Sequence, residues 1–206
     1  MSRSENWAEP QTPVIVTPRL TLRMPDPTKE AAAVVDYFQR NAEHLKYSGP
    51  IPAPGYFEPQ YWQNQLELNR HEFGLDQSMR LFICLNETAA IVGTANFTAI
   101  LRRAAHFCYL GYGIDEKHQG RGYMTEALTH AIEYAFKVRN LHRIMANYVP
   151  HNMRSGALLK RLGFVEEGLA RDYLYLNGQW QDHVMTALTN HDWDANKAQF
   201  NLTSPY

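Results

Sequence analysis

Cysteine is nearly absent from this sequence, which contains only Cys84 and Cys108 among its 206 residues. Two cysteines in apolar, strand-like segments cannot build a disulfide framework, so we interpret both as small buried hydrophobic residues. No apolar run approaches the length of a membrane span, and the first residues lack the basic and apolar stretches of a secretory signal. These absences predict a soluble, cytoplasmic protein that does not enter a membrane.

An excess of charge is lacking as well, because 20 basic and 21 acidic residues give a formal net charge of −1. This balance argues against a protein that binds nucleic acid through bulk positive charge. The nine histidines follow no His-Glu-x-x-His spacing and there is no Cys-x-x-Cys, so we expect no metal site. No Gly-x-Ser-x-Gly stretch supports hydrolase chemistry.

The chain does contain alternating helix and strand patterns, without an internal repeat or a dividing linker. Helices are predicted over 28–41, 59–73, 123–138 and 153–162. Strands are predicted over 14–24, 80–86, 90–101, 106–114 and 142–149, a loop over 44–56, and a hairpin over 169–188 that turns at Asn177–Gly178. We predict an α+β (mixed α/β) protein with a loose segment at 1–13, one domain at 14–194 and a tail at 195–206.

Two glycines separated by one arginine, Gly120-Arg121-Gly122, stand immediately before the helix predicted to begin near Tyr123. Glycine lets the backbone approach a ligand closely and adopt positive φ. The first N–H groups of a helix lack partners within the helix, and together with the helix dipole they attract an anion. Neither a dinucleotide fingerprint nor a P-loop is completed here, so a plain strand-to-helix turn is the alternative.

The segment from Gln119 to Met124 resembles motif A of the GCN5-related N-acetyltransferases, the GNAT superfamily. In that motif, Gln/Arg-x-x-Gly-x-Gly/Ala follows a strand and opens a helix, and here Met124 stands at the last, small position. The resemblance implies a GNAT fold, with a central, mixed, mostly antiparallel, twisted sheet of about seven strands flanked by about four helices. It also implies acetyl-CoA as the co-substrate. The implied coenzyme contacts are Tyr112, Ile114, Gln119, Gly120, Arg121, Gly122, Tyr123, Met124 and Asn152.

Further blocks between about residue 14 and 193 resemble the RimJ/RimL branch of that superfamily, the ribosomal-protein alanine N-acetyltransferases, and its RimJ-type members most of all. These blocks are TPRLTLR, CYLGYGI, HNMRSGALLKRLGF and NGQWQDHVMTAL. The resemblance implies acetyl transfer to the α-amine of an N-terminal alanine by direct attack in a ternary complex. The implied acceptor is the fifth protein of the small ribosomal subunit, so the partner is that N-terminus or the assembling subunit, without sequence-specific contact to nucleic acid. A monomer or a homodimer fits this function.

At the sulfur end, Asn152 and Ser155 match the family's Asn-x-x-Ser. There the serine is taken as the proton donor to the leaving thiolate, and the asparagine contacts the pantetheine arm. Asn152 also suits a helix N-cap, and the two roles are compatible.

The acceptor amine needs only a weak base. An α-amine has an ordinary pKa near 7.7–8.0, so roughly a tenth of it is free base at neutral pH. Leu174 aligns with the glutamate that the RimL-like pattern has in the strand after the last helix, so the resemblance does not give the base. The local candidates are Tyr109, Asp172, Asp182 and His183.

Two other functions fit the same sequence. An acetyltransferase for a small amine, such as an antibiotic or a polyamine, would share the coenzyme half and differ in the acceptor half. A ribosome-assembly factor would retain the acetyl-CoA site without depending on it.

Overall fold

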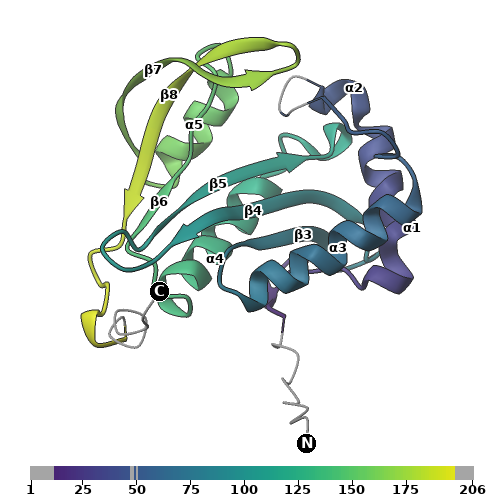
Figure 1. The fold of residues 1–206 in the computed structure, drawn as a ribbon, viewed down its shortest axis with the longest axis horizontal. Helices are drawn as coiled ribbons and strands as arrows, with labels where there is room; N and C mark the ends of the chain where they lie inside the picture. The colour runs from purple at the N-terminus through teal and green to yellow at the C-terminus, as the bar shows by residue number, and fades with distance from the viewer. Residues whose placement is uncertain (1–11, 47–48, 50, 198–206) are drawn as a thin grey trace, which may run out of the picture.

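A twisted sheet of eight strands forms the centre of the described residues, in the order β1-β2-β3-β4-β5-β6-β8-β7 (Figure 1). The structure is a computed structural model that describes residues 12–46, 49 and 51–197. The strands are β1 (Val14–Val16), β2 (Leu20–Arg23), β3 (Met79–Leu85), β4 (Ile91–Leu101), β5 (Phe107–Ile114), β6 (Arg143–Met145), β7 (Val165–Leu176) and β8 (Gln179–Thr189). The helices are α1 (Pro27–Arg40), α2 (Ala42–Leu45), α3 (Pro59–Gly74), α4 (Tyr123–Lys137) and α5 (Met153–Arg161), with a 3-10 turn η1 (Glu116–His118).

Neighbouring strands run antiparallel except β5 and β6, which run parallel. This confirms the predicted α+β fold with a mixed, mostly antiparallel sheet. The sheet has eight strands rather than about seven because the single strand predicted over 14–24 folds back on itself. At the turn, Thr17 donates its N–H to the carbonyl of Leu20 across 2.8 Å, and Pro18 has no N–H with which to continue a ladder.

The four long helices lie within one residue of their predicted bounds. Asp26 caps α1 by accepting a hydrogen bond from the N–H of Thr28 across 2.9 Å, and prolines occupy the first turns of α1 and α3. The loop predicted over 44–56 is wrong at its start, where α2 occupies residues 42–45. Within the described ranges, none of the helices combines the length and the apolarity that crossing a membrane requires.

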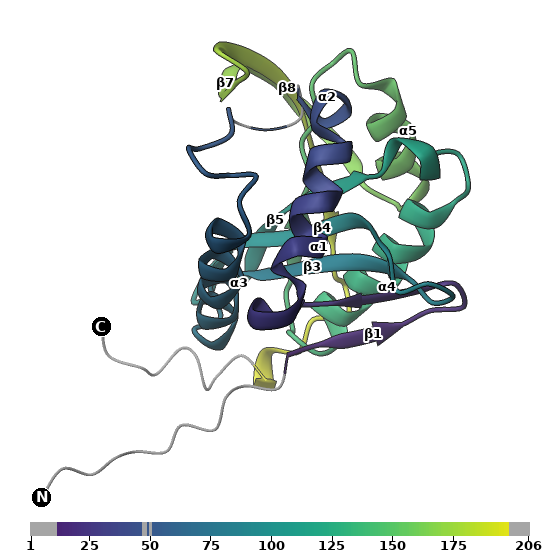
Figure 2. The ribbon, with the colours of Figure 1, turned by 90° about the vertical axis from the view of Figure 1, so that its right-hand side faces the viewer.

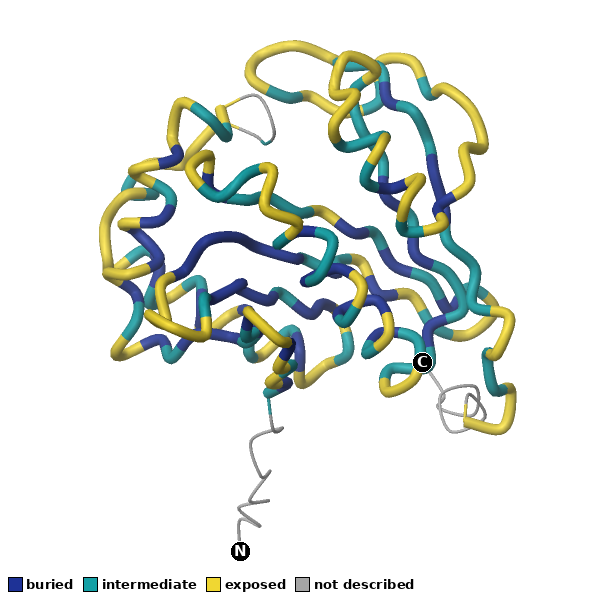
Figure 3. The backbone as a smooth tube through the Cα atoms, turned by 180° about the vertical axis from the view of Figure 1, so that it is seen from behind, coloured by how far each residue is buried: buried dark blue, intermediate teal, exposed yellow. Residues whose placement is uncertain are grey.

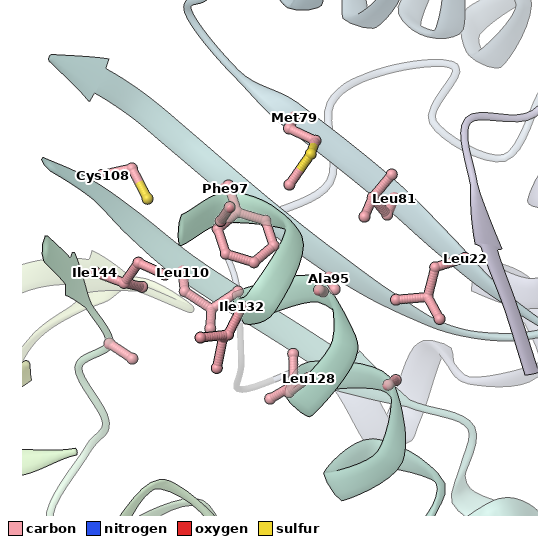
Figure 4. Packing of buried hydrophobic residues seen from close by; sticks show 14 of the residues in the cluster. Leu22, Met79, Leu81, Ala95, Phe97, Cys108, Leu110, Leu128, Ile132 and Ile144 are labelled. Carbon is pink, nitrogen blue, oxygen red and sulfur yellow. The ribbon is translucent and has the colours of Figure 1, made fainter. Parts of the chain in front are cut away.

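Helices cover both faces of the sheet (Figure 2): α4 and α5 pack on one face, and α1 and α3 on the other. On the α4 face, Leu128 and Ile132 pack with Phe97 and Leu110 of the sheet (Figure 4). Leu128 and Phe97 are both 0% exposed. Full burial of one such side chain stabilises the fold by about 1.5–3 kcal/mol. Figure 3 shows that the buried stretches are concentrated in the central strands.

The two parallel strands, β5 and β6, separate partway along β5. β5 pairs with β6 only over Phe107–Tyr109, whereas β4 accompanies β5 to Ile114. The strand predicted over 142–149 ends at Met145, because the chain then turns from β5 and Tyr148 bridges Val184 of β8. Beyond Tyr109, the edge of β5 on the β6 side therefore has no described strand paired with it.

A buried histidine at the far end of β5 makes stability depend on pH. His106 is 4% exposed, and its ring lies 4.9 Å from that of Trp193. Burial lowers the pKa of His106, and the charge of Arg102 lowers it further. The unfolded chain therefore takes up this proton at a higher pH than the folded chain. The resulting stability is present above the ordinary histidine pKa and is lost as pH falls through the folded value.

We therefore expect wild-type protein to lose unfolding free energy between about pH 7.5 and pH 5.5 more steeply than a His106→Asn variant, because asparagine carries no proton in this range and tolerates the positive φ of 46° at this position. Urea unfolding at several pH values measures the slopes. His191→Asn changes an exposed histidine and serves as the control. Parallel slopes for wild type and His106→Asn would contradict the prediction.

Candidate active site

The loop between η1 and α4 presents backbone amides that have no hydrogen-bond partner among the residues that the structure describes. Gly120 and Gly122 have φ of 74° and 77°, the left-handed region that glycine enters without strain. Gly122 is the N-cap of α4, and no side chain caps the helix. The N–H groups of its first turn are thus available to an anion, as predicted from the two glycines.

A cleft of about 880 Å³ lies over this loop. Its walls come from the end of β5, the glycine loop, the first turn of α4, most of α5 and the end of α2. Eight of the predicted coenzyme contacts line it: Tyr112, Ile114, Gln119, Gly120, Gly122, Tyr123, Met124 and Asn152. Arg121 is not among the lining residues, and it is exposed on the loop.

The backbone of β5 offers further donors and acceptors to the cleft. Asp115 donates its N–H to Val92 of the β4 side across 2.7 Å, and β5 continues that antiparallel ladder backwards. In such a ladder, alternate residues direct both backbone groups to the same neighbour. Tyr112 and Ile114 therefore direct theirs away from β4, toward the gap between β5 and β6.

The side chain of Tyr112 joins the site through a contact that the sequence analysis missed. Its hydroxyl lies 2.7 Å from Oγ of Ser155, on α5. Asn152 fixes the start of this helix by accepting a hydrogen bond from the N–H of Ser155 across 3.1 Å. Burial raises the pKa of Tyr112 to about 12, although the hydrogen bond with Ser155 acts in the opposite direction. The phenol therefore keeps its proton at neutral pH.

Gln119 bridges the two sides of the cleft with its side chain. Its amide nitrogen lies 2.9 Å from Nε2 of His44 on α2, and its oxygen accepts a hydrogen bond from Arg154 of α5 across 2.6 Å. Sequence reasoning missed His44, which falls in a segment predicted as loop, and Arg154, which occupies a variable position of Asn-x-x-Ser. Polar side chains thus line the entrance of the cleft from three elements.

Two of the base candidates, Tyr109 and His183, both lie next to Tyr173. Burial raises the pKa of Tyr173, and a hydrogen bond with Tyr109 raises it further. The Tyr173 ring lies 5.5 Å from that of His183. His183 is 3% exposed, and its Nδ1 lies 3.0 Å from the carbonyl oxygen of Gln181. Tyr109 of β5, Tyr173 of β7 and His183 of β8, here called the tyrosine–histidine cluster, lie near one another, and none of the three lines the cleft.

The two aspartates are placed differently. Asp172 is exposed in an irregular part of β7 with φ of 44°. Asp182 accepts hydrogen bonds from the N–H of Asp172 across 2.9 Å and from Arg171 across 3.1 Å. The Asp182 carboxylate thus stabilises the irregularity of β7, and neither aspartate lines the cleft. Among the residues that the structure describes, no group of three or more His, Cys, Asp or Glu side chains is placed to hold a metal ion.

The fold and this cleft agree with a known family. Residues 19–165 match the acetyltransferase (GNAT) domain. The chain therefore belongs to the GNAT acetyltransferase family, which confirms the resemblance seen in its sequence, and it is an acetyltransferase.

Within this family, the chain is similar to acetyltransferases that are named for ribosomal proteins. The [ribosomal protein uS5]-alanine N-acetyltransferase of Escherichia coli is 45% identical over 180 residues, which cover 87% of this chain and 92% of that protein. The structure of ribosomal-protein-S5-alanine acetyltransferase from Vibrio fischeri has a TM-score of 0.84 at 34% identity, covering 88% of this chain and 99% of that chain. RimJ of Mycobacterium smegmatis, solved in complex with CoA-disulfide, has a TM-score of 0.77 at 26% identity, with 88% of each chain covered.

Proposed function

We propose that this protein transfers the acetyl group of acetyl-CoA to the α-amine of the N-terminal alanine of ribosomal protein uS5. The observation that carries the proposal is the 45% identity to an enzyme of that name over 87% of the chain. This similarity spans most of the chain, and the matched GNAT domain at residues 19–165 includes the glycine loop. The cleft supports it, because a backbone anion site at one end and a hydroxyl pair at the other suit a coenzyme with a diphosphate and a thioester.

In the proposed reaction, the amine nitrogen attacks the carbonyl carbon of the thioester, and the carbonyl oxygen becomes an oxyanion. A backbone N–H at the free edge of β5, from Tyr112 or Ile114, is suited to donate to that oxygen, and one such donor contributes about 3–4 kcal/mol. The carbon–sulfur bond then breaks, and the sulfur takes a proton from the Tyr112–Ser155 hydroxyl pair. The amine proton passes to water or to the tyrosine–histidine cluster.

The side of the sheet on which each candidate lies supports one proton acceptor over the others. Cys108 and Leu110 face the core beneath α4, so the alternation of the strand puts Tyr112 on that face and Tyr109 on the opposite one. An amine that approaches from the side opposite α4 and α5 would have Tyr109 on its own side of the sheet. We therefore favour the tyrosine–histidine cluster over Asp172 as the proton acceptor.

The proposal predicts a strong preference for a free N-terminal alanine. With acetyl-CoA and a peptide that carries the uS5 N-terminal sequence, thiol release should be at least about tenfold faster than with the same peptide blocked at its α-amine. Any amine left on the blocked peptide is a lysine side chain, and a lysine amine with a pKa near 10.4 is almost fully protonated. Mass spectrometry of the product locates the acetyl group.

A polyamine and an aminoglycoside replace the peptide in the control reactions, since the alternative function requires a small amine. Faster turnover with either of them would refute the protein acceptor. Binding of the coenzyme without turnover of any amine would instead favour the ribosome-assembly alternative.

A further inference from the structure

The turn between β1 and β2 is attached to the start of α4, more than a hundred positions further along the chain. The carboxylate of Glu126 accepts three hydrogen bonds from this turn: from the Thr17 hydroxyl across 2.6 Å, from the Arg19 N–H across 2.9 Å and from the Arg19 Nε across 2.6 Å. The Glu126 side chain is only 12% exposed. The turn thus holds the first turns of α4 at a fixed distance from the sheet edge.

The same arginine also contacts the glycine loop. Its Nη1 donates to the carbonyl of Arg121 across 2.9 Å. Its guanidinium carbon lies 4.6 Å from the centre of the Tyr123 ring, within the range of a cation–π interaction. Its Nη2 lies 3.5 Å from the point that a Cβ on Gly122 would occupy. One side chain therefore contacts Arg121 and Tyr123 of the loop and lies beside Gly122 between them.

Holding the carbonyl of Arg121 determines where the next amide points. The peptide unit is planar and trans, so the C=O of Arg121 and the N–H of Gly122 point in opposite directions. The carbonyl points to Arg19, and the N–H therefore points away from it. A loop with two glycines has an unusually wide choice of conformations, so an external contact is needed to keep one of them.

Charge supports the same role. Glu126 stands in the first turns of α4, near the positive end of the helix dipole, where its charge would oppose an incoming phosphate. The Arg19 guanidinium neutralises it in a paired, hydrogen-bonded geometry. The anion site of the loop then keeps its attraction for a diphosphate.

We propose that Arg19 is a positioning residue for the coenzyme, which fixes the Gly120–Tyr123 loop from behind with its amides oriented for a diphosphate. The inference rests on the proposed use of acetyl-CoA. Arg19 touches neither the thioester nor the acceptor amine in this arrangement. Its loss should therefore change coenzyme affinity and leave the chemical step alone.

The test compares donors with and without a diphosphate. In an Arg19→Met variant, we expect the KM for acetyl-CoA and the calorimetric Kd for coenzyme A to rise about tenfold, with kcat within about twofold of wild type. With S-acetylpantetheine, which lacks the diphosphate and the nucleotide, kcat/KM should be the same in the variant and in wild type. If Arg19 had a merely structural role, the variant would have a lower kcat/KM with both donors alike, and that result would overturn the inference.

A second variant keeps the test decisive if Arg19→Met folds poorly. Arg19→Lys keeps the charge and the aliphatic stem, but one ammonium group cannot replace the fork that bridges Glu126 and the Arg121 carbonyl. It should raise the KM for acetyl-CoA at least about threefold and again spare S-acetylpantetheine. Arg80→Met is the matched control, since Arg80 pairs with Glu72 at 3.4 Å on the α3 side of the sheet.

The outcomes separate the two proposals. Wild-type protein that binds no coenzyme A would refute the proposed function. Wild-type protein that binds it, together with an Arg19→Met variant that binds equally well, would refute only the role of Arg19.

Discussion

Replacing Gly120 by alanine should weaken the binding of coenzyme A by roughly ten- to a hundredfold. Gly120 has φ of 74°, where an L-residue is strained by about 1 kcal/mol or more. A Cβ on Gly120 would meet no protein atom within 4 Å, and Gly120 lines the cleft. The added methyl group would therefore leave the protein packing intact and occupy space that a bound diphosphate needs. Calorimetric titration with coenzyme A measures the change.

Gly178→Ala provides the matched control for this experiment. Gly178 has φ of 80°, and a Cβ there also meets no atom within 4 Å, so the backbone strain is comparable. It lies at the tip of the β7–β8 hairpin, outside the cleft. Coenzyme affinity should stay at the wild-type value in Gly178→Ala. Equal affinities in Gly120→Ala and wild type would mean that the loop does not bind the diphosphate.

The glycine loop shows why part of the site was predictable from sequence. Its conformation depends on residues that are adjacent in the chain, as does the hairpin turn at Asn177–Gly178, which the structure confirms. Local patterns also predicted the four long helices, because each contains its own apolar stripe, and α1, α3 and α5 begin at a side-chain cap or a proline. These features need no knowledge of what packs against them.

Distant contacts decided the features that the sequence did not predict. The strand over 14–24 breaks where Thr17 and Arg19 turn toward Glu126, 109 and 107 positions away. The Tyr112–Ser155 pair joins residues 43 positions apart, and the Gln119–His44 contact joins residues 75 apart. The two-residue period of β5 puts Tyr112 on the face of Cys108 and Leu110, but nothing local identifies its partner on α5.

The Tyr112–Ser155 contact leads to the second prediction with a large expected effect. If the Tyr112 and Ser155 hydroxyls deliver one proton together, removing either one interrupts the same relay. Ser155→Ala and Tyr112→Phe should each lower kcat by about ten- to a hundredfold, less than a full general-acid effect because a thiolate is a tolerable leaving group. The Tyr112 phenol, with a pKa of about 12, keeps its proton throughout the working pH range, so it remains a donor.

The double variant tests the relay itself. Since both hydroxyls serve one proton transfer, Tyr112→Phe combined with Ser155→Ala should be about as slow as the slower single variant, whereas independent roles would multiply the two losses. The Kd for coenzyme A should stay within about threefold of wild type in all three variants, since no diphosphate contact is lost. Tyr148→Phe is the matched control, because the Tyr148 ring packs closely on Gly156 of the same helix while its hydroxyl is not part of the pair. Multiplied losses, or a kcat of wild-type size in Ser155→Ala, would remove the pair from the reaction and leave water as the source of the proton.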